Sequence, residues 1–140
     1  MARTRRRIQA TPPQRLILDS GAVIALSRND QRARAALAAA WEAGVEVSIP
    51  SLVVAETVRG SAEDGPVNRV IKAVGDVRPA AEGTGRIAGG LLGAARSDST
   101  VDAVVVAAAI EVGGGVILTG DPDDVAALAS GHPEVIVREL

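Results

Sequence analysis

Two short runs of aliphatic residues stand out in the pattern of hydrophobic and polar positions. Leu16 to Leu18 and Val116 to Leu118 contain no polar residue, and a polar segment follows each run. Uninterrupted runs of this length are typical of strands that are buried on both faces of a parallel sheet. Asp19 follows the first run directly, and Asp121 comes shortly after the second. Both acids are therefore predicted at the carboxyl edge of a sheet, where open α/β folds bind their ligands.

The rest of the chain alternates between helical and strand-like spacing of apolar residues. Ser20 and Ser51 each precede an apolar stretch and are predicted to cap a helix. A Pro or Gly ends several of the segments. The expected helices cover residues 20–27, 31–43, 51–60, 68–74, 81–95, 101–112 and 122–129, and further strands are expected at 45–49, 76–79 and 135–137. This alternation predicts a parallel sheet of about four to five strands with helices on both faces.

Composition narrows the kinds of site that the chain can build. A length of 140 residues suits one domain. Trp41 is the only aromatic residue, so base stacking on an aromatic platform is not expected. The sequence has no Cys and a single His, His132, which excludes disulfides, thiolate metal sites and zinc sites built on several imidazoles. No apolar run is long enough to span a membrane, and the chain is expected to be cytoplasmic.

Charge is distributed unevenly along the chain. Four arginines lie among residues 1–14 with no acid, whereas all 17 acids follow residue 15. The sequence therefore divides into a basic N-terminal arm, residues 1–14, and an acidic domain, residues 15–140. The arm is expected to be a disordered, solvated end, and the alternative is a tail that attracts phosphate groups.

Four acids are predicted to meet at one edge of the sheet. Asp19 and Asp121 each follow an aliphatic strand, while Glu56 and Asp102 each lie near the start of a helix. Any one of them alone could cap a helix or complement its dipole. Four carboxylates close together repel one another, however, and no Lys or Arg is near Asp19 or Asp102 in sequence. A hard divalent ion, Mg²⁺ or Mn²⁺, is the expected neutralising partner.

The segments around these acids resemble the motifs of PIN domains. The segments are Leu-Asp-Ser-Gly at Asp19, Val-Ala-Glu-Thr-Val-Arg-Gly at Glu56, Val-Asp-Ala at Asp102 and Leu-Thr-Gly-Asp-Pro-Asp-Asp at Asp121. Their order and spacing are most similar to the VapC-like toxins of bacterial type II toxin–antitoxin pairs. The resemblance runs from about Leu16 to the end of the chain. It implies a PIN-like three-layer α/β/α fold.

The resemblance also implies an activity and partners. The expected protein is an endoribonuclease toxin that hydrolyses RNA with Mg²⁺ or Mn²⁺ and is neutralised by a VapB-like antitoxin. Such toxins are usually homodimers, and the C-terminal segment of the antitoxin enters the acidic groove. By this resemblance Asp19, Glu56, Asp102 and Asp121 would be catalytic and would hold the metal, with Asp124 as a further ligand. Ser20 and Thr119 would support these carboxylates from behind.

Several alternatives stay open at the level of sequence. Asp98 stands four residues before Asp102 and could be a cap or a substrate contact, and Asp123 competes with Asp121 and Asp124 as the fourth acid. The expected contacts to RNA phosphates are the arginines nearest to the acids in sequence, which are Arg28, Arg59 and Arg96. Arg59 is equally placed to pair with Glu56 across one helical turn.

Two other functions compete with the nuclease. One is a catalytically silent PIN-like fold that only binds a partner. The other is a receiver-like phosphoacceptor domain, which would share the α/β layout and the acidic Mg²⁺ pocket. A receiver needs a lysine at the end of a late strand, and Lys72, the only lysine, is expected within a helix.

Overall fold

The fold is built on a five-stranded parallel sheet. The computed structural model describes residues 14–140, so all but the last residue of the predicted basic arm lies outside the described residues. The strands follow the order β3-β2-β1-β4-β5 across the sheet, and every neighbouring pair is parallel. Their bounds are Arg15–Leu18 for β1, Glu46–Pro50 for β2, Val77–Arg78 for β3, Gly115–Thr119 for β4 and Val135–Glu139 for β5. The two aliphatic runs form the adjacent central strands β1 and β4, as predicted.

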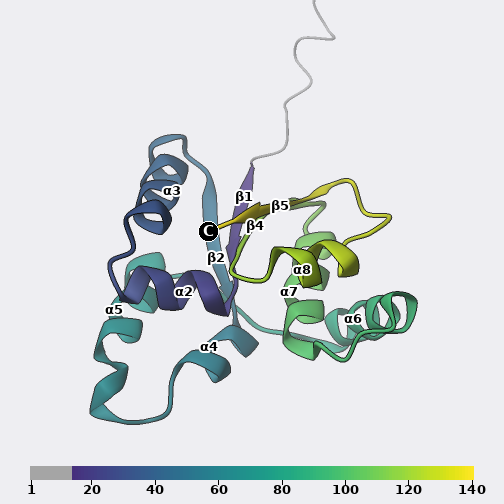
Figure 1. The fold of residues 1–140 in the computed structure, drawn as a ribbon, viewed down its shortest axis with the longest axis horizontal. Coiled ribbons are helices and arrows are strands. Elements are labelled where there is room, and N and C mark those ends of the chain that lie inside the picture. The colour runs from purple at the N-terminus through teal and green to yellow at the C-terminus, as the bar shows by residue number, and fades with distance from the viewer. Residues whose placement is uncertain (1–13) are drawn as a thin grey trace, which may run out of the picture.

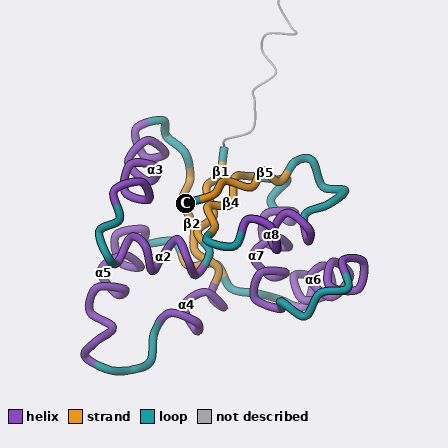
Figure 2. The backbone as a smooth tube through the Cα atoms, in the orientation of Figure 1, coloured by secondary structure: helices purple, strands orange, loops and turns teal. Residues whose placement is uncertain are grey.

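Helices cover both faces of this sheet, which confirms the three-layer α/β/α prediction (Figures 1 and 2). Helices α2, α3 and α5 lie on one face, and α7 lies on the other with α6 and α8 packed beside it. Their bounds are Ser20–Ser27 for α2, Gln31–Glu42 for α3, Ser51–Thr57 for α4, Gly65–Val74 for α5, Glu82–Ala95 for α6, Thr100–Glu111 for α7 and Pro122–Leu128 for α8. Within residues 14–140, none of these helices has the length and apolarity required to cross a bilayer.

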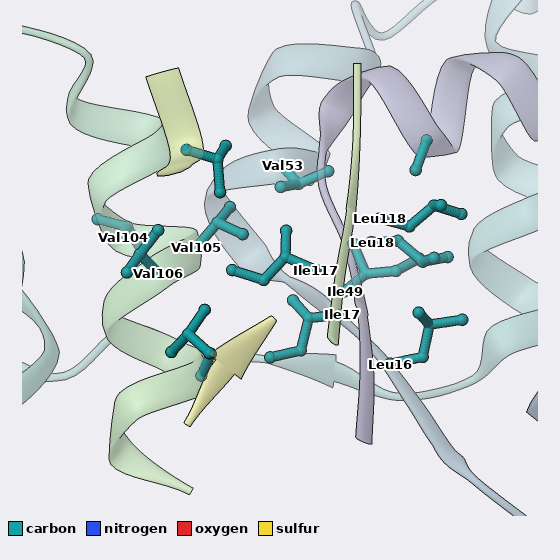
Figure 3. Packing of buried hydrophobic residues seen from close by; sticks show 14 of the residues in the cluster. Leu16, Ile17, Leu18, Ile49, Val53, Val104, Val105, Val106, Ile117 and Leu118 are labelled. Atoms are coloured by element: carbon teal, nitrogen blue, oxygen red, sulfur yellow. The ribbon is translucent and has the colours of Figure 1, made fainter. Parts of the chain in front are cut away.

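The core consists of small aliphatic side chains on both sides of the sheet (Figure 3). Ile17 and Ile117 point toward α7, whereas Leu18 and Leu118 point to the opposite face. This alternation is the two-residue period of a β-strand, and it explains why residues 16–18 and 116–118 of the two central strands are all apolar. On the α7 side the layer is completed by Val104, Val105 and Val106, which are all buried. Helix α7 is therefore apolar almost all round because it is enclosed by the sheet, α6 and α8.

Two predicted helix caps are wrong. Asp19, rather than Ser20, is the N-cap of α2, because its extended backbone lets its carboxylate accept the N–H of Ala22 at 2.9 Å. Ser20 is instead the first residue of α2. At α4 the cap position is occupied by Pro50 without a side-chain hydrogen bond, and Ser51 begins the helix. Both strands pass into their helices without an intervening loop, so the last residue at the strand end takes the cap position.

The segment after α4 also differs from the prediction. Helix α4 was expected to reach about Gly60 but ends at Thr57, and α5 begins at Gly65 rather than near Asn68. The cause is Asp64, whose buried carboxylate accepts the backbone N–H groups of Arg59, Gly60 and Ser61. These donors are drawn away from a helical path, so the chain turns at this point. A short 3-10 turn, Ala62–Asp64, then leads directly into α5.

Candidate functional site

Asp19 lies at the carboxyl end of the central strand β1 and is 3% exposed. Its backbone N–H bonds to Leu118 O of β4, and its carboxylate caps α2. Burial raises the pKa of Asp19, whereas hydrogen bonds from Thr119 and from the N–H groups of Ala22 and Gly120 act in the opposite direction. A buried acid at the end of β1 is thus held in place by β4, by α2 and by Gly120, the residue that follows β4.

The first turn of α2 and the loop after β4 lie against each other with almost no space between them. A Cβ atom at Gly21 would meet Gly120 N at 3.0 Å and Gly120 Cα at 3.1 Å, so only glycine fits at this position without a shift. At the end of β4, the fully buried Thr119 accepts the N–H of Asp121 at 2.8 Å. Thr119 therefore links Asp19 to the loop that carries Asp121.

Glu56 reaches the same place from α4. This helix contacts both α2 and α7 and lies at the carboxyl edge of the sheet (Figure 1). The hydroxyl of Ser20 donates a short hydrogen bond to the carboxylate of Glu56. Ser20 thus orients a side chain that is 36 residues away in sequence.

Asp102, Asp121 and Asp124 form the tightest acidic group among the described residues. One carboxylate oxygen from each lies within 4.8 Å of the others. Asp102 is in the first turn of α7, Asp121 is the N-cap of α8, and Asp124 is in the first turn of α8. The pKa of Asp102 is raised to about 6, first by burial and then by the charges of Asp121, Asp19, Asp124 and Glu56. Asp123, the third acid of this turn, is not in the group.

These acids line a common cavity, which we call the acidic cleft. It has a volume of about 320 Å³ and is bounded by Asp19, Ser20, Gly21, Glu56, residues 98–102 and Asp121. Asp124 lies outside this lining and contacts the group from the α8 side. The sequence alone does not decide whether Asp98 is a helix cap or a substrate contact. In the structure it lines the cleft as a fifth carboxylate. Its spacing of four residues before Asp102 was the only signal for it in the sequence.

The three arginines predicted to contact RNA lie outside the acidic cleft. Arg28 and Arg96 are the C-terminal caps of α2 and α6, respectively. Arg59 follows α4, and its guanidinium donates to the carbonyl oxygens of Ala55 and Val58. The alternative ion pair between Arg59 and Glu56 is therefore not formed. No Lys, Arg or His is among the described residues that bound the cleft.

The donor set of the acidic cleft fits a hard divalent cation. It offers carboxylate oxygens from separate segments, without thiolate or imidazole ligands, and this is the chemistry that Mg²⁺ and Mn²⁺ prefer. The pKa of Asp102 is raised first by burial and then by the charges of the neighbouring acids, and a bound cation would offset both effects. Asp102, Asp121 and Asp124 are close enough to share one ion.

Comparison with protein families identifies the fold that carries this site. The PIN domain model matches residues 16–130, which include every strand-end and helix-start acid of the cleft. The chain belongs to the PIN domain family. A search of curated proteins gives no match.

Three solved structures of bacterial proteins have a similar fold. A toxin–antitoxin complex from Klebsiella pneumoniae matches with a TM-score of 0.68 and 19% identity over 89% of this chain and 99% of that chain. VapBC2 from Rickettsia felis, bound to a DNA fragment from its promoter, matches with a TM-score of 0.68 and 12% identity over 89% and 98%. FitAcB from Neisseria gonorrhoeae gives 0.57 and 18% over 87% and 95%. Identities this low establish similarity of fold.

Proposed function

We propose that this PIN domain is a VapC-like endoribonuclease toxin that hydrolyses phosphodiester bonds of RNA with Mg²⁺ or Mn²⁺. The observation that carries the proposal is the meeting of acids from separate segments in a cleft that no described basic residue lines. A fold does not establish a function by itself, so the proposal depends on this site. Phosphodiesters are anionic, and a carboxylate cleft can act on them only when a cation is bound there.

Asp102, Asp121 and Asp124 would hold the ion, with Asp19 and Glu56 as further partners in the cleft. When bound, the ion would attract the substrate phosphate and lower the pKa of a water molecule. Asp19 has little freedom to move because it is buried and also caps α2. Glu56 accepts from Ser20 and is exposed at the cleft, which suits a role in orienting water or taking its proton.

Thr119 and Gly21 would keep these groups in register. Thr119 joins the carboxylate of Asp19 to the backbone of Asp121, and Gly21 allows the start of α2 to meet the loop after β4. Arg28, Arg59 and Arg96 do not line the cleft itself. Their proposed role is therefore to contact the RNA phosphates on either side of the one that is cut. The described domain, residues 14–140, is acidic in total, which favours a small specific contact over broad binding to the RNA backbone.

The partners follow from the same proposal. The three structures of similar fold are a toxin–antitoxin complex, VapBC2 and FitAcB. This similarity supports a cognate VapB-like antitoxin for the chain. An antitoxin segment with a cationic side chain would suit the acidic cleft. A homodimer and a cytoplasmic location belong to the same proposal.

The two rival functions receive less support. A receiver-like domain would need a lysine near the acids, and Lys72 lies on α5 and does not line the cleft. A silent binding module would not require the support that Ser20 and Thr119 provide to Glu56 and Asp19.

The experiment is cleavage of structured RNA by the purified chain, free of antitoxin, with Mg²⁺, with Mn²⁺ and with a chelator. We expect cleavage only with a divalent ion, and loss of cleavage in Asp19→Asn, which keeps the size and cap position of the side chain. The proposal is wrong if the chain cuts no RNA with either ion, or if Asp19→Asn cuts as fast as the parent.

A further inference from the structure

One wall of the acidic cleft is a short turn between α6 and α7, and it has a fixed shape. Arg96 adopts the left-handed conformation at φ 52°, which ends α6. The Ser97 hydroxyl then accepts the N–H of Ser99 at 3.1 Å, and the Thr100 N–H donates to Asp98 O at 2.9 Å. These bonds occupy the backbone of the turn and leave the side chains of residues 98–100 along the cleft.

The carboxylate of Asp98 has no structural task among the described residues. It accepts no hydrogen bond and forms no ion pair there, and Ser99 rather than Asp98 is the N-cap of α7. By contrast, the carboxylate of Asp19 caps α2 and that of Glu56 accepts from Ser20. Asp98 also differs from Asp121 and Asp124, because it is not part of the tight group around Asp102. It is an exposed acid at the rim of the cleft.

The chemistry of this wall limits which part of a nucleotide can face it. A carboxylate without a neighbouring cation repels phosphate groups. It accepts hydrogen bonds, and the donors that a nucleotide offers are the N–H groups on the base edges and the ribose hydroxyl. No aromatic residue lines the cleft, so a base at this wall would be held by its edge instead of by stacking. Ser99 and Thr100 place hydroxyl groups beside Asp98 that can donate or accept.

We propose that Asp98 is a specificity-determining residue, which accepts hydrogen bonds from the base edge of a nucleotide next to the phosphate that is cut. This inference rests on the proposed ribonuclease function and names the feature of RNA that the cleft selects. Guanine is the expected base, because its N1–H and N2–H₂ groups lie side by side and match the two oxygens of a carboxylate. Uracil offers a single N–H on the corresponding edge.

The test measures binding, so it does not depend on turnover. Four labelled oligouridines carry G, A, C or U at the central position, and their dissociation constants are measured by fluorescence anisotropy with Ca²⁺ replacing Mg²⁺. A gel confirms that each RNA stays intact. The proteins are the parent chain, Asp98→Asn, Asp98→Ala and the control Glu63→Gln. Glu63 is exposed and lies outside the cleft lining, so the control removes the same unit of charge elsewhere.

We expect the parent and Glu63→Gln to bind the G oligonucleotide at least about fivefold more tightly than the U oligonucleotide. Both Asp98 variants should bind all four RNAs with similar affinity, and their melting temperatures should match that of the parent. The inference is overturned if the parent shows no preference among the four RNAs, or if Asp98→Asn keeps the same ranking. If the parent binds none of the RNAs, the ribonuclease proposal fails as well, which separates the two results.

Discussion

Asp64 and Asp102 are acids in two regions of one domain, and the protein treats them in opposite ways. Asp64 lies in the turn before α5, and its carboxylate accepts three backbone N–H groups at 2.7 to 3.2 Å. The N–H of Arg59 is the main cause that lowers the pKa of Asp64. Asp102 receives no hydrogen bond from the described residues, and its surroundings raise its pKa to about 6. Only the second environment calls for a cation.

The difference shows how a structural acid can be told from a candidate catalytic one. Backbone donors satisfy Asp64, so its negative charge organises a turn and nothing further is required. At Asp102 the neighbours are Asp19, Glu56, Asp121 and Asp124, whose charges oppose its ionisation. A fold keeps such a destabilising arrangement where function needs it.

The largest effect is expected on cleavage when Asp102 is changed. Asp102→Asn should lower the initial rate of RNA cleavage with Mn²⁺ by about 100-fold or more, because the amide cannot neutralise the ion as a carboxylate does. Asp64→Asn, assayed at a temperature at which it is folded, should cut close to the parental rate. Comparable losses in the two variants would remove the functional distinction between the two acids.

A smaller but clear effect on stability is expected where Gly21 of α2 meets Gly120 in the loop after β4. Gly21→Ala should lower the free energy of unfolding by about 1–3 kcal/mol, because its Cβ would press on the backbone of Gly120. Cleavage should fall with it as Asp19 and Asp121 move apart. The matched control is Gly89→Ala in α6, where the added Cβ meets no described atom within 4 Å apart from its chain neighbours and the nearby backbone of its own helix, and it should stabilise the protein by up to about 1 kcal/mol. Denaturant unfolding of both variants separates these outcomes.

Asp102 and Asp64 are expected to change the stability of the protein with pH in opposite directions. The folded pKa of Asp102, about 6, lies above its usual value of 3.8, so the folded state binds the proton more tightly. The stability of the metal-free parent should therefore fall as the pH rises from about 4 to 6. Asp102→Asn should lack this fall and be more stable at pH 7 by about 1 kcal/mol, a small figure because solvent screens a partly exposed group. Added Mn²⁺ should stabilise the parent and leave the variant almost unchanged.

At Asp64 the direction is reversed. A lowered folded pKa means that the unfolded state binds the proton more tightly, so the contribution is complete above the ordinary pKa of 3.8. It is lost as the pH falls through the lower folded value. Asp64→Asn should melt below the parent at pH 7, and the gap should narrow at acid pH. An Asp64→Asn variant whose gap stays constant from pH 7 to pH 3 would contradict this reading of its hydrogen bonds.

Most elements of the fold were predictable because their signals are local. The unbroken aliphatic runs of β1 and β4 are confirmed as central strands, and the apolar stretch after Thr100 is confirmed as a buried helix. Local signals failed where a distant group competes for the same atoms. The end of α4 could not be predicted, because Asp64 captures the N–H groups that would have continued the helix. The cap of α2 is predicted at Ser20, whereas Asp19 occupies that position and the Ser20 hydroxyl donates to Glu56, a partner that is remote in sequence.

The sequence by itself determined the kind of fold and the kind of chemistry. Alternating strands and helices require a layered parallel sheet, and acids placed after its strands must meet at its carboxyl edge. Only the tertiary structure decided which acids come close enough to bind one ion and which are held by hydrogen bonds from neighbouring residues. Asp124 joins Asp102 and Asp121, Asp123 does not, and Asp98 lines the cleft without a partner among residues 14–140. The physical reason is that distances of a few ångströms between carboxylates depend on how remote segments pack, as Gly21 packs on Gly120. A local sequence pattern does not contain this information.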